Sequence, residues 1–117
     1  MSMQQTHVAN GVGHFDIAGP DLPVLGRFYS SVFGWSVDAR GPGYALVQTP
    51  EGAVNGAIIE SETSALTLGV VVPDIEAAVA EAGRSGGGVV MPVTDNGWVK
   101  KAQVADPAGN VITLIQG

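Results

Sequence analysis

Two turns in this chain are near copies of each other. Thr49-Pro50-Glu51-Gly52 and Asp106-Pro107-Ala108-Gly109 each follow a run with strand-like character and lead into another such run. A second pair of landmarks precedes them in the same order, because Asp21 and Asp74 each stand between a strand-like run and a helical pattern. The aspartates are 53 positions apart and the turns are 57 positions apart. This repetition predicts two similar modules and restricts the folds that the chain can adopt.

Each module is expected to contain a strand, a helix and three further strands. The expected strands of the first module cover about 12–18, 35–39, 43–49 and 53–60, and those of the second cover about 66–72, 88–93, 97–105 and 110–116. A helix is expected from Asp21 to Gly34, and another from Asp74 to the glycines at 86–88. Both helices are indicated by apolar residues at helical spacing, by an aspartate at the N-cap and by glycine after the last turn. The predicted fold class is therefore α+β, with two tandem βαβββ modules at about 11–60 and 66–117.

Length and composition limit the class of protein. A chain of 117 residues fits one domain, at 11–117, and residues 1–10 show no periodicity and are expected to form a flexible N-terminus. The absence of cysteine excludes disulfides and thiolate chemistry. A net charge of −6 with only 5 Lys and Arg residues argues against nucleic acid as a partner. No run is apolar enough to span a membrane and no signal segment is evident, so we expect no membrane partner and a cytoplasmic location.

Three motifs, taken in order, resemble one protein superfamily. They are His14-Phe15-Asp16-Ile17, Phe28-Tyr29-x-x-Val32-Phe33-Gly34-Trp35 and Asp106-Pro107-x-Gly109-Asn110. Together with the repeated βαβββ pattern they resemble the vicinal oxygen chelate superfamily, which includes glyoxalase I, bleomycin-resistance proteins and extradiol dioxygenases. The resemblance implies that 11–117 is a single glyoxalase-like domain, in which the two modules form a curved, partly closed mixed sheet around a cleft. It also implies a homodimer, since a curved half-barrel leaves an apolar edge to cover.

The resemblance also indicates where a metal would bind. In enzymes of this superfamily the cleft holds a divalent metal on inward-facing strand residues, commonly His and Glu, as a Lewis acid or a site for dioxygen. His14 occupies the first such position, Leu68 the second, Gly56 the third and Thr113 the fourth. Only His14 matches, and a divalent cation needs several well-placed donors. The sequence therefore predicts no native metal centre and no cofactor, with a divalent metal at His14 as the alternative.

His14 and Asp16 are the candidate catalytic residues. They lie two positions apart on one expected strand, so both side chains lie on the same face. A carboxylate beside an imidazole holds one tautomer and raises the basicity of the ring, which suits a general base. The alternative is that His14 only lines the cleft and that Asp16 bonds to a neighbouring strand or to a partner chain.

Aromatic side chains supply further candidates. Trp98 is expected to begin the seventh strand and to alternate there with Lys100 and Ala102, which makes it a candidate for the cleft or for an interface. Trp35 could stack on a ligand, but closing the end of the first helix against the sheet is the favoured role. The predicted ligand-binding residues are thus His14, Asp16, Leu68, Trp98 and Thr113.

Other polar residues receive structural or open assignments. Tyr44 and Gln48 share one face of the third expected strand, and they could, together with Gln103 of the seventh, orient a polar ligand in an apolar cavity. Such residues also lie half exposed on many sheets. Asp106 is expected to bond the backbone amides of its own turn.

The predicted function is that of a small-molecule binding protein of the glyoxalase and bleomycin-resistance type, without a native metal centre. The enzyme alternative is a glyoxalase-like lyase or isomerase that acts through His14, with a divalent metal or with Asp16. A third possibility is an interaction module with no ligand, in which the protein's own side chains fill the cleft. The sequence alone leaves open whether the protein is an enzyme.

Overall fold

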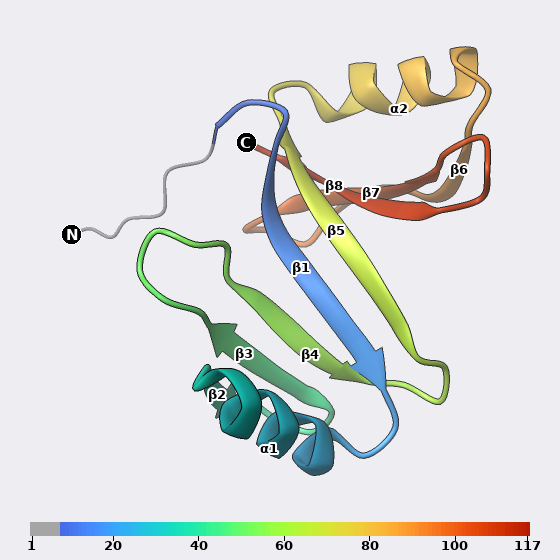
Figure 1. The fold of residues 1–117 in the computed structure, drawn as a ribbon. Helices are drawn as coiled ribbons and strands as arrows, with labels where there is room; N and C mark the ends of the chain where they lie inside the picture. Colours follow the sequence, from blue (N-terminus) through green and yellow to red (C-terminus); the bar gives the residue numbers. More distant parts are fainter. Residues whose placement is uncertain (1–7) are drawn as a thin grey trace. The chain divides into compact units, whose positions relative to one another are not determined.

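The computed structural model describes residues 8–117, which form two helices and eight strands (Figure 1). In chain order these are β1 (Gly11–Gly19), α1 (Leu22–Phe33), β2 (Ser36–Ala39), β3 (Tyr44–Gln48), β4 (Gly56–Glu60), β5 (Ala65–Val72), α2 (Ile75–Arg84), β6 (Gly88–Asp95), β7 (Lys100–Ala105) and β8 (Val111–Gln116). The expected α+β class is confirmed. The prediction of a flexible N-terminus falls largely on residues 1–7, which lie outside the described residues.

The chain divides into two compact units, each with one helix and one group of strands. The α1 unit is His14–Thr67, and the α2 unit is Leu68–Gly117 with the described residues before His14. In both units the order along the chain is a strand, a helix and three strands. The elements therefore follow the order expected from the two pairs of landmarks.

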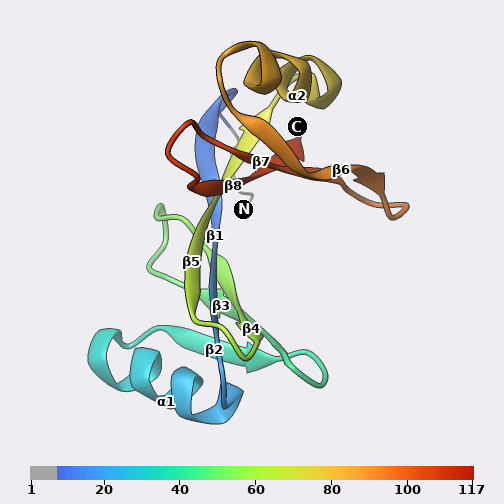
Figure 2. The same cartoon turned by 90° about the vertical axis from the view of Figure 1, so that its right-hand side faces the viewer.

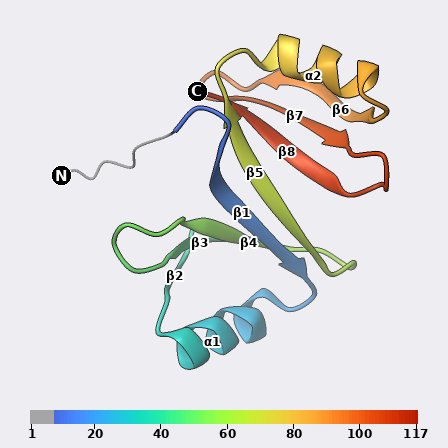
Figure 3. The same cartoon turned by 45° about the horizontal axis from the view of Figure 1, so that its top comes forward.

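In the α1 unit the strands are ordered β2-β3-β4-β1, and α1 covers one face of β2, β3 and β4 (Figure 3). β1 pairs with β4 in parallel, and the other two pairs are antiparallel. Ile17, Val47 and Ile58 form the buried core between the sheet and the helix. Gly56 is required there, because a Cβ atom at this position would collide with the Phe15 carbonyl oxygen.

The α1 helix begins and ends at the expected residues. Asp21 is the N-cap and its side chain accepts a hydrogen bond from the Val24 amide at 3.3 Å, while Gly34 ends the helix with a positive φ of 72°. A carboxylate oxygen of Glu60, at the end of β4, accepts a further hydrogen bond from the Leu22 amide at 3.0 Å. The helix is therefore tied at its N-terminus to the last strand of its own unit.

In the α2 unit the strands are ordered β5-β8-β7-β6, and α2 lies along one face of β6, β7 and β8 (Figure 2). β5 and β8 are parallel, and the remaining pairs are antiparallel. The core consists of residues from β5, α2, β7 and β8: Val72, Ile75, Ala102, Val104 and Leu114. The parallel pair again joins the first and last strands of the unit.

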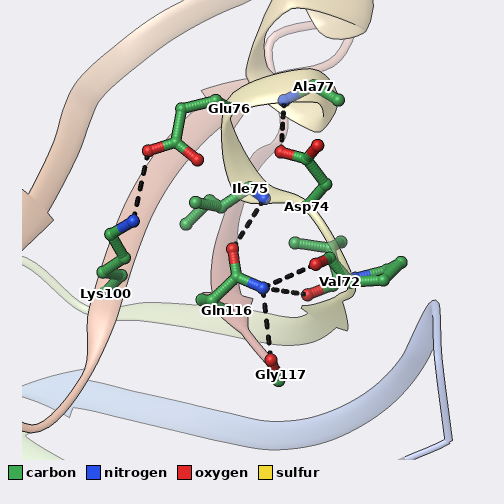
Figure 4. A network of polar contacts seen from close by, with 9 residues as sticks. Val72, Asp74, Ile75, Glu76, Ala77, Lys100, Gln116 and Gly117 are labelled. Atoms are coloured by element: carbon green, nitrogen blue, oxygen red, sulfur yellow. Dashed lines mark hydrogen bonds and ion pairs between the residues drawn. The ribbon is translucent and has the colours of Figure 1, made fainter.

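Gln116 fixes the start of α2 (Figure 4). Its amide oxygen accepts a hydrogen bond from the Ile75 amide at 2.9 Å, and its amide nitrogen donates to the Pro73 carbonyl at 2.6 Å and to the Gly117 carbonyl at 3.2 Å. Asp74 is the N-cap, as expected, and accepts from the Ala77 amide at 3.1 Å. Gln116 thus occupies the place in this unit that Glu60 occupies in the α1 unit.

The seventh strand is shorter than expected. It begins at Lys100, so Trp98 lies in the loop between β6 and β7. The Asn96 side-chain oxygen accepts hydrogen bonds from the Trp98 amide at 3.2 Å and the Val99 amide at 3.1 Å. These local bonds satisfy the backbone within the turn, so the pairing with β6 ends before it reaches Trp98. The prediction that Trp98 begins the strand is wrong.

Candidate functional site

The His14 and Asp16 side chains meet on β1. An imidazole nitrogen of His14, Nε2, lies 3.0 Å from a carboxylate oxygen of Asp16, Oδ1, and the two side chains are 28% and 22% exposed. Phe15 and Ile17, which alternate with them, pack toward α1. The pair therefore lies on the sheet face opposite the helix, where both residues were expected to share one face.

The strand register determines what surrounds this pair within the α1 unit. Asp16 pairs with Ala57 of β4, Ala57 pairs with Leu46 of β3, and Leu46 pairs with Asp38 of β2. One row across the sheet therefore runs from a carboxylate over two apolar residues to a second carboxylate. Asp38 is bound by Arg40, whose Nε lies 2.8 Å from a carboxylate oxygen of Asp38.

The next row on the same face is more apolar. It runs from Ala18 of β1 through Ile59 of β4 to Tyr44 of β3, which is 39% exposed. Gln48 lies on the same face of β3, two residues beyond Leu46. The expected sharing of one face by Tyr44 and Gln48 is thus seen, and the register adds that this is also the face of Asp16.

Thr113 lies on the corresponding face of the α2 unit. Its neighbours Ile112 and Leu114 pack toward α2, so the threonine side chain lies on the opposite face of the sheet. Thr113 is only 5% exposed, and its hydroxyl oxygen accepts a hydrogen bond from the Gln103 amide at 3.2 Å. The sequence singled out both residues, but only the β7–β8 register brings them together.

The helix-facing core residues align the two units. Ile17 pairs with Ile58 beside α1, and Val70 pairs with Leu114 beside α2. The first strands therefore correspond at an offset of 53 residues, from 17 to 70, and the last strands at 56, from 58 to 114. The offset of the last strands is one less than the 57 residues that separate the two turns.

This alignment changes the counterpart of His14 in the second module. At an offset of 53 residues the counterpart is Thr67, whereas the sequence assigned Leu68. Leu68 lies on the same face of β5 as Val70, which is the face toward α2, and it is 53% exposed. The spacing of 53 residues between the N-cap aspartates equals the offset between the first strands, because each helix begins the same number of residues after the first strand of its module.

The counterpart of Thr113 changes in the same way. The counterpart is Ala57 and not Gly56. A side chain at position 56 would point toward Phe15, on the helix side of the sheet. A shift by one residue moves a side chain to the other face of a strand. Neither Ala57 nor Gly56 offers a side-chain atom that could bind a metal.

The two tryptophans have different surroundings. Trp35 stacks on Tyr29 with ring centroids 5.7 Å apart and planes 10° apart, and it also lies 5.7 Å from Phe15. It therefore closes the end of α1 against the sheet, which confirms the favoured interpretation. Trp98 is 89% exposed in its loop, and its part in ligand binding stays a prediction.

Asp106 acts within its own turn, as expected. Its carboxylate accepts hydrogen bonds from the side-chain amide of Asn110 and from the backbone amides of Asn110 and Ala108, each at 2.9 Å. The Asn110 side chain, followed by these backbone amides, holds the pKa of Asp106 below its ordinary value. The turn is therefore fixed by an ionised carboxylate, and Asp106 is not needed to explain any chemistry at the β-strands.

Comparison with known families identifies the fold. A family model described as a glyoxalase-like domain matches residues 14–115. The chain belongs to the glyoxalase-like domain family. This match over most of the chain confirms the resemblance to glyoxalase-like proteins that the sequence motifs showed.

The structural neighbours are distant in sequence. Methylmalonyl-CoA epimerase from Mycobacterium tuberculosis is 19% identical, with a TM-score of 0.68 over 97% of this chain and 92% of that one. A glyoxalase/bleomycin resistance protein/dioxygenase superfamily member from Vibrio splendidus 12B01 is 19% identical, with a TM-score of 0.69 over 88% and 96%. A variant of Streptomyces coelicolor methylmalonyl-CoA epimerase, in complex with 2-nitronate-propionyl-CoA, is 17% identical, with a TM-score of 0.66 over 94% and 99%.

At these identities the neighbours show that this glyoxalase-like protein shares their fold. No match was found among curated proteins. Neither helix in the described part of the chain is long and apolar enough to cross a membrane.

The donors of this glyoxalase-like protein do not fit the metal site that the superfamily resemblance implies. Among residues 8–117 there is no group of three or more His, Cys, Asp or Glu side chains that could hold a metal ion. The four corresponding strand positions carry His14, Thr67, Ala57 and Thr113, and the carboxylate that contacts His14 is that of Asp16. One imidazole and one carboxylate supply too few ligands for a selective divalent site.

Proposed function

We propose that this glyoxalase-like protein binds a small molecule without a native metal centre. His14, Asp16 and Thr113 are the residues through which we expect the ligand to be held. The proposal keeps four expectations from the sequence: tandem modules in a curved, partly closed sheet around a ligand cleft, a homodimer, a cytoplasmic location, and an affinity for ligands like those of the bleomycin-resistance type. Leu68 and Trp98 remain secondary candidates for contact with the ligand.

The proposal rests on which polar side chains lie on the helix-free face of the sheet in each unit. His14 is bonded to Asp16 in the α1 unit, and Thr113 is bonded to Gln103 in the α2 unit, so each unit carries one hydrogen-bonded polar pair on its helix-free face. A few oriented polar groups on an apolar surface are typical of small-molecule sites. Metal enzymes instead need several anionic or imidazole ligands directed at one point.

The rival function is a glyoxalase-like lyase or isomerase. It is favoured by the 3.0 Å contact between His14 and Asp16, which suits proton removal by the imidazole with the carboxylate holding its tautomer. Several structural neighbours are methylmalonyl-CoA epimerases. In this alternative His14 would remove a proton from carbon next to a carbonyl group and return it, either with Asp16 alone or with a divalent metal.

Metal analysis separates the proposal from the metal-dependent rival. The purified protein is dialysed against chelator, and nickel, zinc and manganese are then titrated by calorimetry. We expect no tight one-to-one binding. One equivalent bound tightly by the natural protein and lost in His14→Ala would overturn the metal-free proposal.

Ligand binding is tested by thermal shift with planar, cationic and aldehyde-derived compounds. A compound present at about tenfold its Kd stabilises the native state by roughly 1.4 kcal/mol, which raises Tm by about 5 °C in a domain of this size. We expect at least one such compound, with a smaller shift in Asp16→Asn than in the natural protein. If no compound in a broad panel raises Tm, the binding proposal fails and the interaction module is favoured.

A further inference from the structure

We infer that the α1 unit binds a protonated amine carried on a flat apolar body, with the Asp16 carboxylate as the partner of the amine. This inference rests on the proposed binding function and names the class of ligand. The flat body would lie on the helix-free face of the sheet, over Leu46, Ala57 and Ile59. We call these three residues the apolar floor.

The apolar floor is continuous because of the strand register. Ala57 pairs with Leu46, and Ile59 follows Ala57 by two residues on the same face of β4. Adjacent strands lie about 4.8 Å apart, so the distance from Asp16 on β1 to Leu46 on β3 is roughly 10 Å. This matches the length of a fused two-ring molecule with a short substituent. Ala57 is only 1% exposed, whereas Leu46 and Ile59 are half-buried, so the flat body would rest mainly on these two larger side chains.

Asp16 lies at one end of the floor with an oxygen free to accept. Its Oδ1 atom is bound by His14, and Oδ2 has no hydrogen-bond partner among the described residues. No buried side-chain nitrogen or oxygen of these residues lacks a partner, so Oδ2 is accessible from outside the protein. With a neutral imidazole the His14–Asp16 pair carries one negative charge. A hydrogen bond from an ammonium group to such an oxygen is charge-assisted and about twice as strong as a neutral one.

The charges of the α1 unit favour a cation and disfavour an anion. The unit contains six acidic residues, no lysine and two arginines, Arg27 and Arg40. Arg27 is on α1, which covers the other face of the sheet, and Arg40 is bound to Asp38. No cation of the unit is therefore available on this face to bind a carboxylate or phosphate ligand. A ligand amine would meet the complementary charge, and it would not have to displace Arg40.

Tyr44 lies at the other end of the floor. It pairs with Ile59 across β3 and β4 and is 39% exposed, so part of its ring surface is open to a ligand. Aromatic rings stack favourably on flat apolar molecules. Asp16 therefore selects the charge of the ligand, and Tyr44 favours the flat body.

Three probes with one shape and different charge test this inference. They are 2-naphthylmethylamine, 2-naphthylmethanol and 2-naphthoate, titrated into the full chain and followed by amide chemical shifts in NMR. We expect the amine to bind at least about tenfold more tightly than the alcohol, with shifts at β1, β3 and β4, and the carboxylate to bind least. Asp16→Asn should remove the preference for the amine, and Tyr44→Ala should weaken the amine and the alcohol equally.

Asp38→Asn is the matched control, because Asp38 lies on the same face but is bound by Arg40. It should leave the ratio between amine and alcohol unchanged. Equal binding of all three probes would overturn the inferred ligand class while leaving the proposed binding function in place. Binding of none of them overturns the site itself, and the broad thermal-shift panel then decides separately whether the protein binds small molecules.

Discussion

The α1 and α2 units carry different polar pairs, at different strand positions, on their helix-free faces. On the helix-free face of the α1 unit, His14 and Asp16 form an ionisable pair that is about a quarter exposed. On the matching face of the α2 unit, Thr113 and Gln103 form a neutral pair, and Thr113 is 5% exposed. Two units can therefore share an architecture while only one of the two polar pairs contains ionisable side chains. The scaffold determines where side chains lie, and individual substitutions determine what they can do.

The two units also differ in the side chain that bonds the first turn of each helix. Glu60 offers only acceptors and bonds the Leu22 amide, whereas Gln116 bonds the Ile75 amide and also donates to the carbonyl groups of Val72, Pro73 and Gly117. An acid suffices where a helix needs one acceptor, and it adds favourable charge at the positive end of the helix dipole. An amide is needed where the last strand must also bond neighbouring carbonyls.

The largest effect is expected from removing a core side chain in either unit. Ile58 and Ile75 are both fully buried: Ile58 lies on β4 in the core beside α1, and Ile75 is the first residue of α2. Ile58→Ala and Ile75→Ala should each lower the free energy of unfolding by about 2–5 kcal/mol, because each leaves a cavity. Urea unfolding measures the loss, with Val89→Ala as the control at a position that is 53% exposed.

These two variants also test whether the units are independent. A chain of this length is expected to unfold in one cooperative transition, so both variants should lower the protection of amides in both cores. Hydrogen exchange followed residue by residue gives the answer. If Ile75→Ala lowered protection in the α2 core alone, the α1 unit would be a separately stable unit.

An exchange of acid and amide at the helix N-termini should have a smaller and unequal effect. Gln116→Glu removes the donor to the Pro73 and Gly117 carbonyls and brings a carboxylate toward them, so we expect a loss of about 1 kcal/mol near pH 7. Glu60→Gln keeps the acceptor for Leu22 and should change stability by less than about 0.5 kcal/mol. Thermal unfolding of both variants provides the comparison. Equal losses would show that the donor bonds of Gln116 contribute nothing.

The smallest effect concerns the two similar turns. The pKa of Asp106 is lowered in the folded state, chiefly by Asn110, so its contribution is complete above the ordinary pKa of an aspartate and is lost as pH falls through the lowered value. Asp106→Asn should therefore flatten the decline of Tm in acid. In the other turn Thr49 bonds the Val54 carbonyl and the Asn55 side chain, and neither group titrates.

Thr49→Ala is accordingly the control for this prediction. It should lower Tm by a similar amount at every pH and keep the acid slope of the natural protein. If Asp106→Asn kept the full slope, the acid sensitivity would have to arise from other carboxylates, with Glu81 the next to examine because Ser85 and Arg84 lower its pKa.

Much of the fold could be predicted because its signals are local. Asp21, Asp74 and Gly34 define helix ends through bonds and backbone angles within a few residues, and all three act as expected. Strand alternation likewise placed His14 and Asp16 on one face. The loop position of Trp98 was missed, because the Asn96 side chain competes with strand pairing and alternation gives no sign of this.

The candidate site was harder to predict because it depends on register. The turns suggested an offset of 57 residues, whereas the core residues beside the helices give 56 for the last strands. An error of one residue moves a side chain to the other face of its strand. In the last strands this error led to Gly56 in place of Ala57, and in the first strands an error of the same size led to Leu68 in place of Thr67. The two aspartates gave a better measure for the first strands, since a helix start is fixed relative to the strand that precedes it.

The sequence by itself determined the order of elements, the helix ends, the family resemblance and the scarcity of metal-binding side chains, because each depends on residue type and short spacing. Only the tertiary structure decided that Thr113 is bonded by Gln103, that Asp16 lies at the end of an apolar floor, and that Gln116 and Glu60 hold the two helices. These contacts join residues from different strands and helices. They follow from strand pairing and from which face meets the helix core, and local sequence patterns do not encode either one to the nearest residue.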